Sequence, residues 1–406
     1  MLVIGGGAAG MMCAITAARL GAKVTLLERN AKIGRKLYIT GKGRCNVTNC
    51  STGQEFAANI VSNARFLYGA LSRFDSYATM DFFESAGVPL KVERGNRVFP
   101  VSDKSADIID ALLREAKAAG VRLVFDCRVQ TLIFERNTYV ATTDKGLFCD
   151  PIVVLATGGA SYPLTGSTGD GYRFAEALGH SVVPTVGALV GLKVNDTASL
   201  SGLSLKNVRL TIEDNGKPLY SEFGEMLFTH TGLSGPIVLS LSSRINRLPS
   251  ARLSAVLDTK PAVDVKSLDD RLQKELCANN KQLLHAVEGF LPKALIPNWI
   301  ERAAVDPRKV ANSVTKEERA RLAAGLKRFV YPILGTEPLE SAVVTAGGVS
   351  VGEIDPKTMQ SKLCEGLFFA GEIMDVDALT GGYNLQIAFA TGYSAAIAAA
   401  KKEKGL

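Results

Sequence analysis

Apolar and polar positions follow two different patterns along this chain, and each pattern predicts its own kind of element. Short, wholly apolar segments are typical of buried parallel strands. Longer segments with apolar residues three and four positions apart predict helices. The predicted strands are residues 2–4, 23–27, 121–125, 151–156 and 366–370; the predicted helices include residues 106–119 and two alanine-rich runs, one ending near residue 20 and one beginning near Asn384 or Leu385. This alternation is typical of an α/β fold.

The middle of the chain has a different pattern. Residues 189–194, 205–212, 219–229 and 251–258 have strand character, and Asn215-Gly216 is a strong signal for a hairpin turn. Residues 265–331 then have helical spacing, with a capping box at Thr315 and Glu318. We therefore expect an antiparallel β-domain that is inserted into the α/β domain and contains a small helical part.

The first predicted strand leads into a glycine-rich motif. Gly5, Gly7 and Gly10 have the G-x-G-x-x-G spacing, and Glu28 follows the second strand about twenty residues on. In such a unit the glycines allow a tight turn, a close approach to a pyrophosphate and close packing of helix on strand. The carboxylate accepts hydrogen bonds from ribose hydroxyls. Strand, glycines, helix, strand and acid in this order predict a dinucleotide site.

A basic loop follows this unit. Residues 29–44 contain six basic residues and no acidic one, and Gly34, Gly41 and Gly43 predict irregular backbone. A charge run is usually a solvated surface. Because this one directly follows the nucleotide-binding unit, we favour a loop along the cofactor, with Lys36, Thr40 and Arg44 available to its polar groups.

Two later segments are predicted to return the chain to the dinucleotide site. The apolar strand 151–156 runs into Thr157 and Gly158, and the strand 366–370 runs into Gly371 and Glu372. A double glycine at Gly381 and Gly382 then precedes the last helix. The positive end of that helix is suited to stabilising negative charge on a reduced ring system.

Several of these motifs together resemble one known family. VIGGGAAG, GRKLYITGKGRCNVTN, GNRVFPVSDKS and GEMLFTHTGLSGP are similar to segments of the BaiN-like (YhiN-type) family of FAD-dependent oxidoreductases. The resemblance implies bound FAD, with Arg44, Cys45 and Asn46 near the isoalloxazine, an acidic residue at Glu372 for a ribityl hydroxyl and Val129 at the adenine. Motifs and resemblance together predict these FAD-contacting residues: Gly5, Gly7, Ala8, Ala9, Gly10, Glu28, Arg29, Arg35, Lys36, Thr40, Gly43, Arg44, Cys45, Asn46, Val129, Thr157, Gly158, Gly371, Glu372, Gly382, Tyr383, Asn384, Leu385 and Gln386.

The resemblance also implies how the domains are arranged. We expect a discontinuous, Rossmann-type FAD-binding domain (residues 1–185 and 346–406), a β-barrel-like insert (residues 186–263 and 332–345) and a helical subdomain (residues 264–331). The active site would lie between the flavin ring and the insert, since ligand sites favour domain interfaces.

Composition narrows the functional classes. With 47 Lys and Arg against 40 Asp and Glu the chain carries a net charge of +7, which suits anionic ligands, but it contains no long basic run typical of nucleic-acid binding. We expect a small-molecule substrate, no nucleic-acid partner, no membrane span and no metal. Seven scattered cysteines favour reduced thiols and a cytoplasmic location. Cys45 and Cys50 have the C-x₄-C spacing of flavoprotein disulfide reductases, so a redox-active pair is a second interpretation.

The predicted chemistry is hydride transfer at flavin N5, with His230, Arg44 and Tyr383 as catalytic candidates. Three functions compete: an NAD(P)H-linked reductase of a conjugated carbonyl compound, an amine oxidase that uses oxygen, and an RNA-directed or non-catalytic flavoprotein. No second G-x-G-x-x-G follows a later strand, so NAD(P)H would bind only transiently. The substrate, the redox partner and the oligomeric state do not follow from the sequence.

Overall fold

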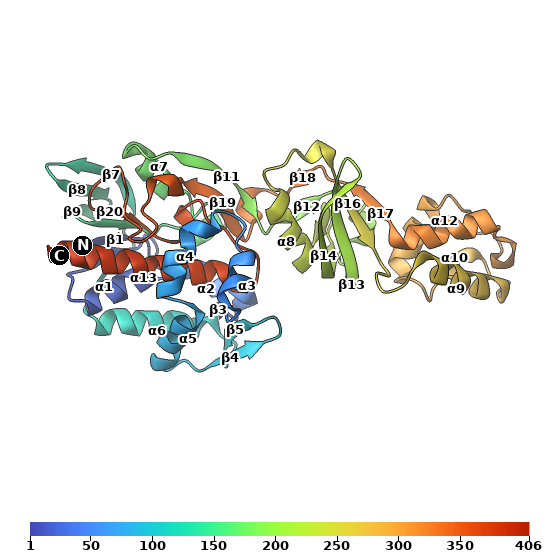
Figure 1. Cartoon of the computed structure of the whole chain (residues 1–406), viewed down its shortest axis with the longest axis horizontal. Coiled ribbons are helices and arrows are strands. Elements are labelled where there is room, and N and C mark those ends of the chain that lie inside the picture. Colours follow the sequence, from blue (N-terminus) through green and yellow to red (C-terminus); the bar gives the residue numbers. More distant parts are fainter. Residues whose placement is uncertain (406) are drawn as a thin grey trace. The chain divides into compact units, whose positions relative to one another are not determined.

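The computed structural model describes residues 1–405, which divide into two compact units. Unit 1 comprises Met1–Ala188 and Pro338–Leu406, and unit 2 is Leu189–Glu337 (Figure 1). Unit 2 is thus an insertion between two segments of unit 1. The further division of the insert into a β part and a helical part stays a prediction.

A five-stranded parallel sheet forms the centre of unit 1, in the order β20-β10-β1-β2-β6. Its strands are β1 (Leu2–Ile4), β2 (Thr25–Leu27), β6 (Arg122–Val124), β10 (Val153–Leu155) and β20 (Leu367–Phe369). The last residue of β1, Ile4, is in register with the last residues of both its neighbours, Leu27 and Leu155. The carboxyl ends of the strands therefore form one edge.

Helices cover this sheet, and glycines allow two of them to approach closely. The helices of unit 1 are α1 (Ala8–Arg19), α2 (Arg35–Ile39), α3 (Gly53–Ala58), α4 (Ala64–Arg73), α5 (Ser76–Ser85), α6 (Ser105–Ala118), α7 (Asp170–Ala177) and α13 (Tyr383–Glu403). Helices α1 and α13 pack against each other. A β-carbon at Gly392 of α13 would lie 2.3 Å from the Ala9 carbonyl oxygen of α1. This contact requires glycine.

Three smaller β-structures complete unit 1. A three-stranded sheet has the order β3-β5-β4, a meander has the order β7-β8-β9, and β11 pairs with β19. Their bounds are β3 (Thr48–Asn49), β4 (Leu90–Glu93), β5 (Arg97–Pro100), β7 (Val129–Glu135), β8 (Thr138–Thr143), β9 (Gly146–Asp150), β11 (Val182–Ala188) and β19 (Val344–Val349). The meander is antiparallel, because β8 pairs antiparallel with both β7 and β9.

Unit 2 contains a seven-stranded antiparallel sheet in the order β17-β16-β13-β14-β15-β12-β18. Its strands are β12 (Leu192–Lys193), β13 (Ser204–Asp214), β14 (Lys217–Phe228), β15 (Gly232–Ser234), β16 (Leu253–Asp258), β17 (Phe329–Pro332) and β18 (Gly335–Thr336). The edge strands β17 and β18 are joined by Ile333 and Leu334 alone, whose N–H groups donate to Leu253 near one edge and Lys193 near the other. The sheet therefore curls until its two edges approach each other.

Helices and strands of unit 2 share one apolar core. The helices are α8 (Pro236–Ile245), α9 (Val265–Cys277), α10 (Leu283–Ala286), α11 (Ile296–Arg302) and α12 (Lys316–Lys327). Trp299 is fully buried, and its indole N–H donates to the Leu322 carbonyl oxygen over 2.9 Å. The predicted capping box is present at the start of α12, between Thr315 and Glu318. No helix within residues 1–405 is long and apolar enough to cross a membrane.

The predicted elements differ from the structure mainly at their ends. The last helix begins at Tyr383, slightly earlier than predicted, because Gly382 takes the left-handed conformation (φ 100°) at its N-cap. The strand predicted at residues 151–156 is shorter: Asp150 accepts a hydrogen bond from the N–H of Ile152, so the ladder begins at Val153.

A buried histidine fastens the end of α7 to the segment before β20. His180 Nδ1 lies 3.0 Å from Glu353 Oε2, and Nε2 lies 2.8 Å from Ser361 Oγ. The ring packs edge-on against Phe369. Burial lowers the pKa of His180, although the Glu353 carboxylate opposes this shift. The folded state therefore favours the neutral imidazole.

We expect acidification from about pH 7.5 to about pH 5.5 to lower the free energy of unfolding. An unfolded histidine gains its proton near pH 6.5, whereas folded His180 resists it, so stability is lost as the pH falls through that value. Urea unfolding at several pH values measures the slope. His180→Gln should flatten it, and His285→Gln, at an exposed histidine, should not; equal slopes in all three proteins would contradict this account.

Candidate functional site

The loops that follow four neighbouring strands meet at the carboxyl edge of the parallel sheet. They begin at Gly5 after β1, Glu28 after β2, Ala156 after β10 and Ala370 after β20. In open α/β sheets, ligands bind at this edge. The fold thus brings together four segments that the sequence predicted separately, and we call this edge the strand-end site.

The three motif glycines have different roles. Gly5 has φ 111°, and a β-carbon there would lie 2.4 Å from the Ala156 carbonyl oxygen. A β-carbon at Gly10 would lie 1.9 Å from the Gly5 carbonyl oxygen, so α1 can rest on β1 only with glycine at this position. Around a β-carbon at Gly7 no atom of another segment lies within 4 Å. Gly7 is the N-cap of α1, so the helix N-terminus faces open space that suits a pyrophosphate.

Glu28 is largely buried and is oriented by two backbone N–H groups and one side-chain amide. One of its carboxylate oxygens accepts a hydrogen bond from the Gly6 N–H over 2.8 Å. The other accepts from the Asn30 N–H and from the Asn30 side-chain amide, over 2.8 and 2.6 Å. A carboxylate has about four acceptor sites, so these three bonds leave capacity for a ribose hydroxyl.

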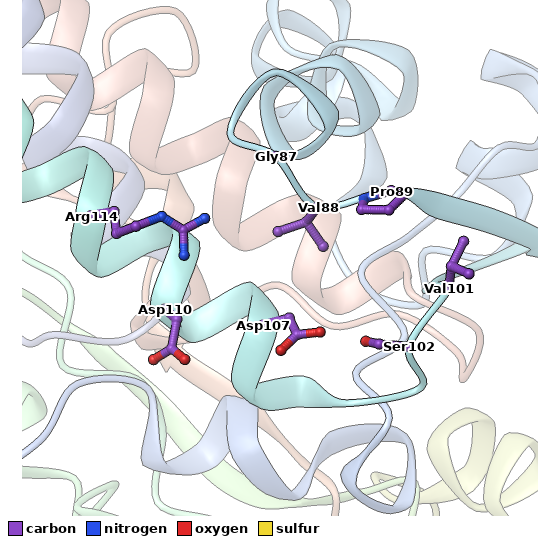
Figure 2. A pocket seen from close by; sticks show the side chains of 8 residues that line it. All are labelled: Gly87, Val88, Pro89, Val101, Ser102, Asp107, Asp110 and Arg114. Carbon is purple, nitrogen blue, oxygen red and sulfur yellow. The ribbon is translucent and has the colours of Figure 1, made fainter.

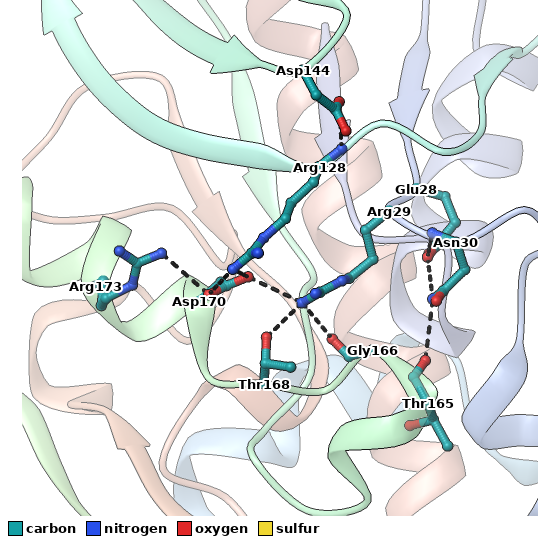
Figure 3. Close-up of polar contacts among 10 residues, drawn as sticks. All are labelled: Glu28, Arg29, Asn30, Arg128, Asp144, Thr165, Gly166, Thr168, Asp170 and Arg173. Atoms are coloured by element: carbon teal, nitrogen blue, oxygen red, sulfur yellow. Dashed lines mark hydrogen bonds and ion pairs between the residues drawn. The ribbon is translucent and has the colours of Figure 1, made fainter.

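Beside Glu28, three arginines surround one carboxylate (Figure 3). Arg29, Arg128 and Arg173 contact Asp170 at 3.1–3.4 Å, and Arg29 also donates to Thr168. Burial alone would raise the pKa of Asp170, but Arg128, Thr168 and Arg29 together hold it below its usual value. The cluster keeps an excess of positive charge next to Glu28.

Lys36 and Glu372 form an ion pair, with their charged atoms 2.7 Å apart. Lys36 also donates to the Ser161 hydroxyl over 2.7 Å, and Glu372 accepts from the Thr345 N–H over 2.8 Å. Two residues predicted to contact the cofactor separately therefore stabilise each other. The sequence pattern did not reveal the roles of Ser161 and Thr345, because their contacts depend on strand β19 and the loop after β10 lying side by side.

Three of the six basic side chains of the loop, Arg29, Lys36 and Arg44, pair with acids that are distant in the sequence. Arg44 is paired with both Glu93 and Asp103, and its guanidinium carbon lies 4.2 Å from the centre of the Phe99 ring. These bonds raise the pKa of Arg44 and lower the pKa of Glu93, whereas hydrogen bonds from Lys91 and then Arg44 lower the pKa of Asp103. Arg35 donates to Asn30, and the Thr40 hydroxyl donates to the Leu37 carbonyl oxygen.

Next in the chain, Cys45 is fully buried with φ 59°. Burial raises the pKa of the Cys45 thiol to about 12, so it stays protonated. Cys45 and Cys50 are both free cysteines, and their redox pairing stays a prediction. The side-chain oxygen of Asn46 is a buried acceptor without a partner among residues 1–405, and it lies against the N-cap of α13.

The first residues of α13 are held by the fold itself. The Gln386 amide accepts from the hydroxyls of Thr48 and Thr79 and donates to the Phe74 carbonyl oxygen, and it is fully buried. The Asn384 side chain bonds the backbone of Ala378. The side chains of Gln386 and Asn384 are therefore both hydrogen-bonded within the protein itself. Leu385 is half-buried beside them.

Tyr383 is buried and packs edge-on against Phe56, with ring centres 4.8 Å apart. Burial raises the pKa of Tyr383, and the Ser51 hydroxyl partly offsets this. Its phenol is therefore protonated at neutral pH and can donate. Gly382 before it closely approaches the Thr48 carbonyl oxygen.

The remaining candidates are placed as follows. Gly371 packs against Ala9 of α1, and Gly158 lies next to the Ser167 hydroxyl. Val129 is buried at the start of β7, and the Thr157 hydroxyl is buried without a partner in the described chain. The other predicted positions are Ala8, which is buried in the first turn of α1, and Gly43, which is half-buried in the basic loop.

The third catalytic candidate, His230, belongs to unit 2. It is exposed in the turn between β14 and β15, where the Thr229 N–H donates to the Gly232 carbonyl oxygen. Its neighbour Thr231 donates to Glu337 over 2.6 Å. His230 is therefore accessible to a substrate.

A cavity of about 470 Å³ lies elsewhere in unit 1 (Figure 2). It is lined by residues of α6, among them Asp107, Asp110 and Arg114, and by the segments at Val88 and Val101. None of the predicted cofactor residues lines it. Within residues 1–405, no group of three or more histidine, cysteine or acidic side chains is arranged to hold a metal ion.

The parallel sheet, the glycines at the start of α1 and the carboxylate after β2 define a Rossmann-type dinucleotide-binding protein, and its family and relatives place it in the class of FAD-dependent oxidoreductases. The comparison with known families agrees: the family described as "HI0933-like protein Rossmann domain" matches residues 1–398. The chain belongs to this family, and the predicted resemblance and fold class are confirmed.

Curated relatives cover nearly the whole chain. A 3-dehydro-bile acid delta(4,6)-reductase of Clostridium scindens is 34% identical, over 98% of this chain and 98% of the relative. Ribosomal RNA dihydrouridine synthases of Haemophilus influenzae and Escherichia coli are 31% and 32% identical; the alignments cover 99% and 97% of this chain and 98% and 96% of the relatives.

Solved structures share the fold at low identity. Escherichia coli quinol fumarate reductase FrdA matches with a TM-score of 0.51 and 17% identity, over 99% of this chain and 70% of that one. A 3-ketosteroid delta1-dehydrogenase of Sterolibacterium denitrificans matches with a TM-score of 0.50 and 15% identity, over 99% of both chains. These likenesses concern the fold alone.

Substitutions at two of the motif glycines should separate folding from cofactor binding. In Gly10→Ala the new methyl group clashes with the Gly5 carbonyl oxygen; overpacking of this kind costs about 1–3 kcal/mol, more than the helix gains from alanine. Gly7→Ala meets no atom and keeps an allowed backbone, so the stability of the apoprotein should be unchanged while bound FAD is lost. Thermal unfolding of apoprotein and flavin absorbance of the purified proteins measure both effects. Full FAD content in Gly7→Ala would contradict the assignment of the pyrophosphate position.

Proposed function

We propose that this protein holds FAD at the strand-end site and reduces a carbon–carbon double bond that is conjugated to a carbonyl group. Two kinds of relatives support the reaction class. The name of one specifies a delta(4,6)-reductase of a 3-dehydro-bile acid, and the names of the others specify synthesis of dihydrouridine. Both reactions saturate a double bond next to a carbonyl, so the shared chemistry carries the proposal.

The proposed cofactor contacts use the groups described above. The N–H groups at the start of α1 bind the pyrophosphate beside Gly7, and Glu28 accepts the ribose hydroxyls. Asn46 offers its unpartnered side-chain oxygen, and Glu372, oriented by Lys36, accepts a ribityl hydroxyl. The orphaned acceptor of Asn46 and the open space at Gly7 both fit a bound group.

When bound and reduced, FAD would supply a hydride to the β-carbon of the substrate. The protein then supplies one proton to the α-carbon, so that two electrons and two hydrogen atoms are added in all. NAD(P)H is the proposed reductant that returns the oxidised flavin to its reduced state. Tyr383 and His230 are the candidate proton donors, and Arg44 is the candidate for orienting the carbonyl oxygen.

The reductase assignment can be tested with anaerobic, FAD-loaded protein. NADH or NADPH should bleach the flavin, and a 3-oxo-Δ4 steroid should restore its colour. His230→Ala should lower turnover about 100-fold with FAD content unchanged, the range of a lost proton donor. His285→Ala is the matched control, since His285 is also an exposed histidine of unit 2. Unchanged turnover in His230→Ala would remove that role; peroxide release with an amine and oxygen would favour the amine-oxidase alternative.

Uridine in ribosomal RNA is the second candidate substrate, and the charge of unit 2 favours it. Residues 189–337 contain 21 basic and 16 acidic residues, which is +5 of the total +7. Polyanions are attracted by such a surplus, and their affinity falls with added salt. From the sequence we expected no nucleic-acid partner, because no long basic run is visible. A surplus of basic residues that is dispersed over a folded unit produces no such run.

Ribosomal RNA transcripts and a conjugated steroid ketone should be compared in the same assay. If RNA is the substrate, reduced protein forms dihydrouridine in the transcript, and a rise from about 50 to about 200 mM salt weakens binding by at least about tenfold. Steroid turnover without dihydrouridine would contradict the RNA candidate and leave the reaction class in place.

A further inference from the structure

A second concave site lies in unit 1, at the C-terminal half of α13. It has a volume of about 430 Å³ and is bounded by α13, by Arg73 at the end of α4 and by the segment that contains Lys357. Ser394, Ile397, Ala398 and Lys401 line it and share one face of α13, since they follow one another at helical spacing. None of its lining residues belongs to the proposed FAD site.

The charge of this hollow is strongly positive. Arg73, Lys357, Lys401 and Lys402 line it, and Lys402 alone among them pairs with a carboxylate, Glu365, in the described part of the chain. The nearby Asp355 is turned to the backbone N–H groups of residues 357 and 358. Among residues 1–405, Arg73, Lys357 and Lys401 therefore line the hollow without an ion-pair partner.

The end of α13 explains only part of this charge. A helix C-terminus favours lysine in its last turn, which accounts for Lys401 and Lys402. Arg73 and Lys357 come from other segments, and Arg73 donates to the Lys357 carbonyl oxygen. This bond joins the two segments and fixes the Arg73 guanidinium beside the backbone of Lys357.

A buried hydroxyl in the lining is the second observation. Ser394 is 1% exposed, and its Oγ has no hydrogen-bond partner within residues 1–405. A buried hydroxyl without a partner costs about 1–3 kcal/mol, so native proteins seldom retain one without a compensating ligand or function. In this hollow an oxygen atom of an anionic ligand would accept its proton.

We propose that the hollow is a binding site for a small phosphate-bearing molecule, separate from the FAD site. Arg73, Lys357 and Lys401 neutralise the phosphate, because guanidinium and ammonium groups are the usual phosphate partners. Ser394 donates to it or to an adjoining oxygen. Ile397 and Ala398 supply an apolar surface for the organic part. The volume is within the usual range of small-molecule sites, about 300–1,000 Å³.

Calorimetric titration of the FAD-loaded protein tests this site, with inorganic phosphate, GMP and guanosine as probes. FAD fills the dinucleotide site, so binding there does not contribute. We expect GMP to bind at one site, phosphate to bind more weakly, and guanosine to show no saturable binding. Ser394→Ala and Lys401→Gln should each weaken GMP binding at least tenfold. Absence of saturable binding by both phosphate and GMP would overturn the proposal.

Stability separates a binding role from a structural one. Ser394→Ala removes an unpartnered hydroxyl, so the thermal stability of the ligand-free holoprotein should be unchanged or higher, while its stabilisation by GMP falls. Lys117→Gln is the matched control for Lys401→Gln, because Lys117 is also a basic residue in the last turn of a helix. Equal GMP affinity in wild type, Ser394→Ala and Lys401→Gln would contradict the assignment of the site.

Discussion

The contact between Gly10 and the carbonyl oxygen of Gly5 is the constraint on which the rest of the site depends. It lets α1 rest directly on β1 and places the helix N-terminus at the edge where the strands end. The same part of α1 is then approached by Gly371 after β20 and by Gly392 of α13, each at a distance that only glycine permits. Segments from both ends of the chain are thereby packed against α1.

Charge at this edge is organised in pairs that join distant segments. Lys36 meets Glu372, Arg29 meets Asp170, and Arg44 meets Glu93 and Asp103. Each pair fixes a loop whose backbone is irregular, so the loops keep their positions through side-chain bonds. Such pairing also limits how freely the cations can turn to a ligand. Three cations of a loop that the sequence shows only as a basic segment are therefore held by specific partners.

The two units differ in the features that they contribute to the proposed function. Unit 1 carries the elements that any FAD-dependent enzyme of this fold needs, which explains its likeness in fold to enzymes of very different names. Unit 2 has its own core and a curled antiparallel sheet, and it carries most of the net charge. Relatives that cover nearly the whole chain include both a bile-acid reductase and a ribosomal RNA dihydrouridine synthase.

The sequence by itself determined the fold class and the dinucleotide motif, because strand, glycine, helix and acid are local signals that a few neighbouring residues specify. Gly5, Gly7, Gly10 and Glu28 could be assigned from their spacing alone. Only the tertiary structure decided what the distant side chains do. The partners of Arg44 lie about fifty and sixty residues away, Gln386 proved to be held by Thr48 and Thr79, and Ser161 and Thr345 gained a role through Glu372. Pairings of this kind arise from how strands and helices pack, which no local pattern of residues records.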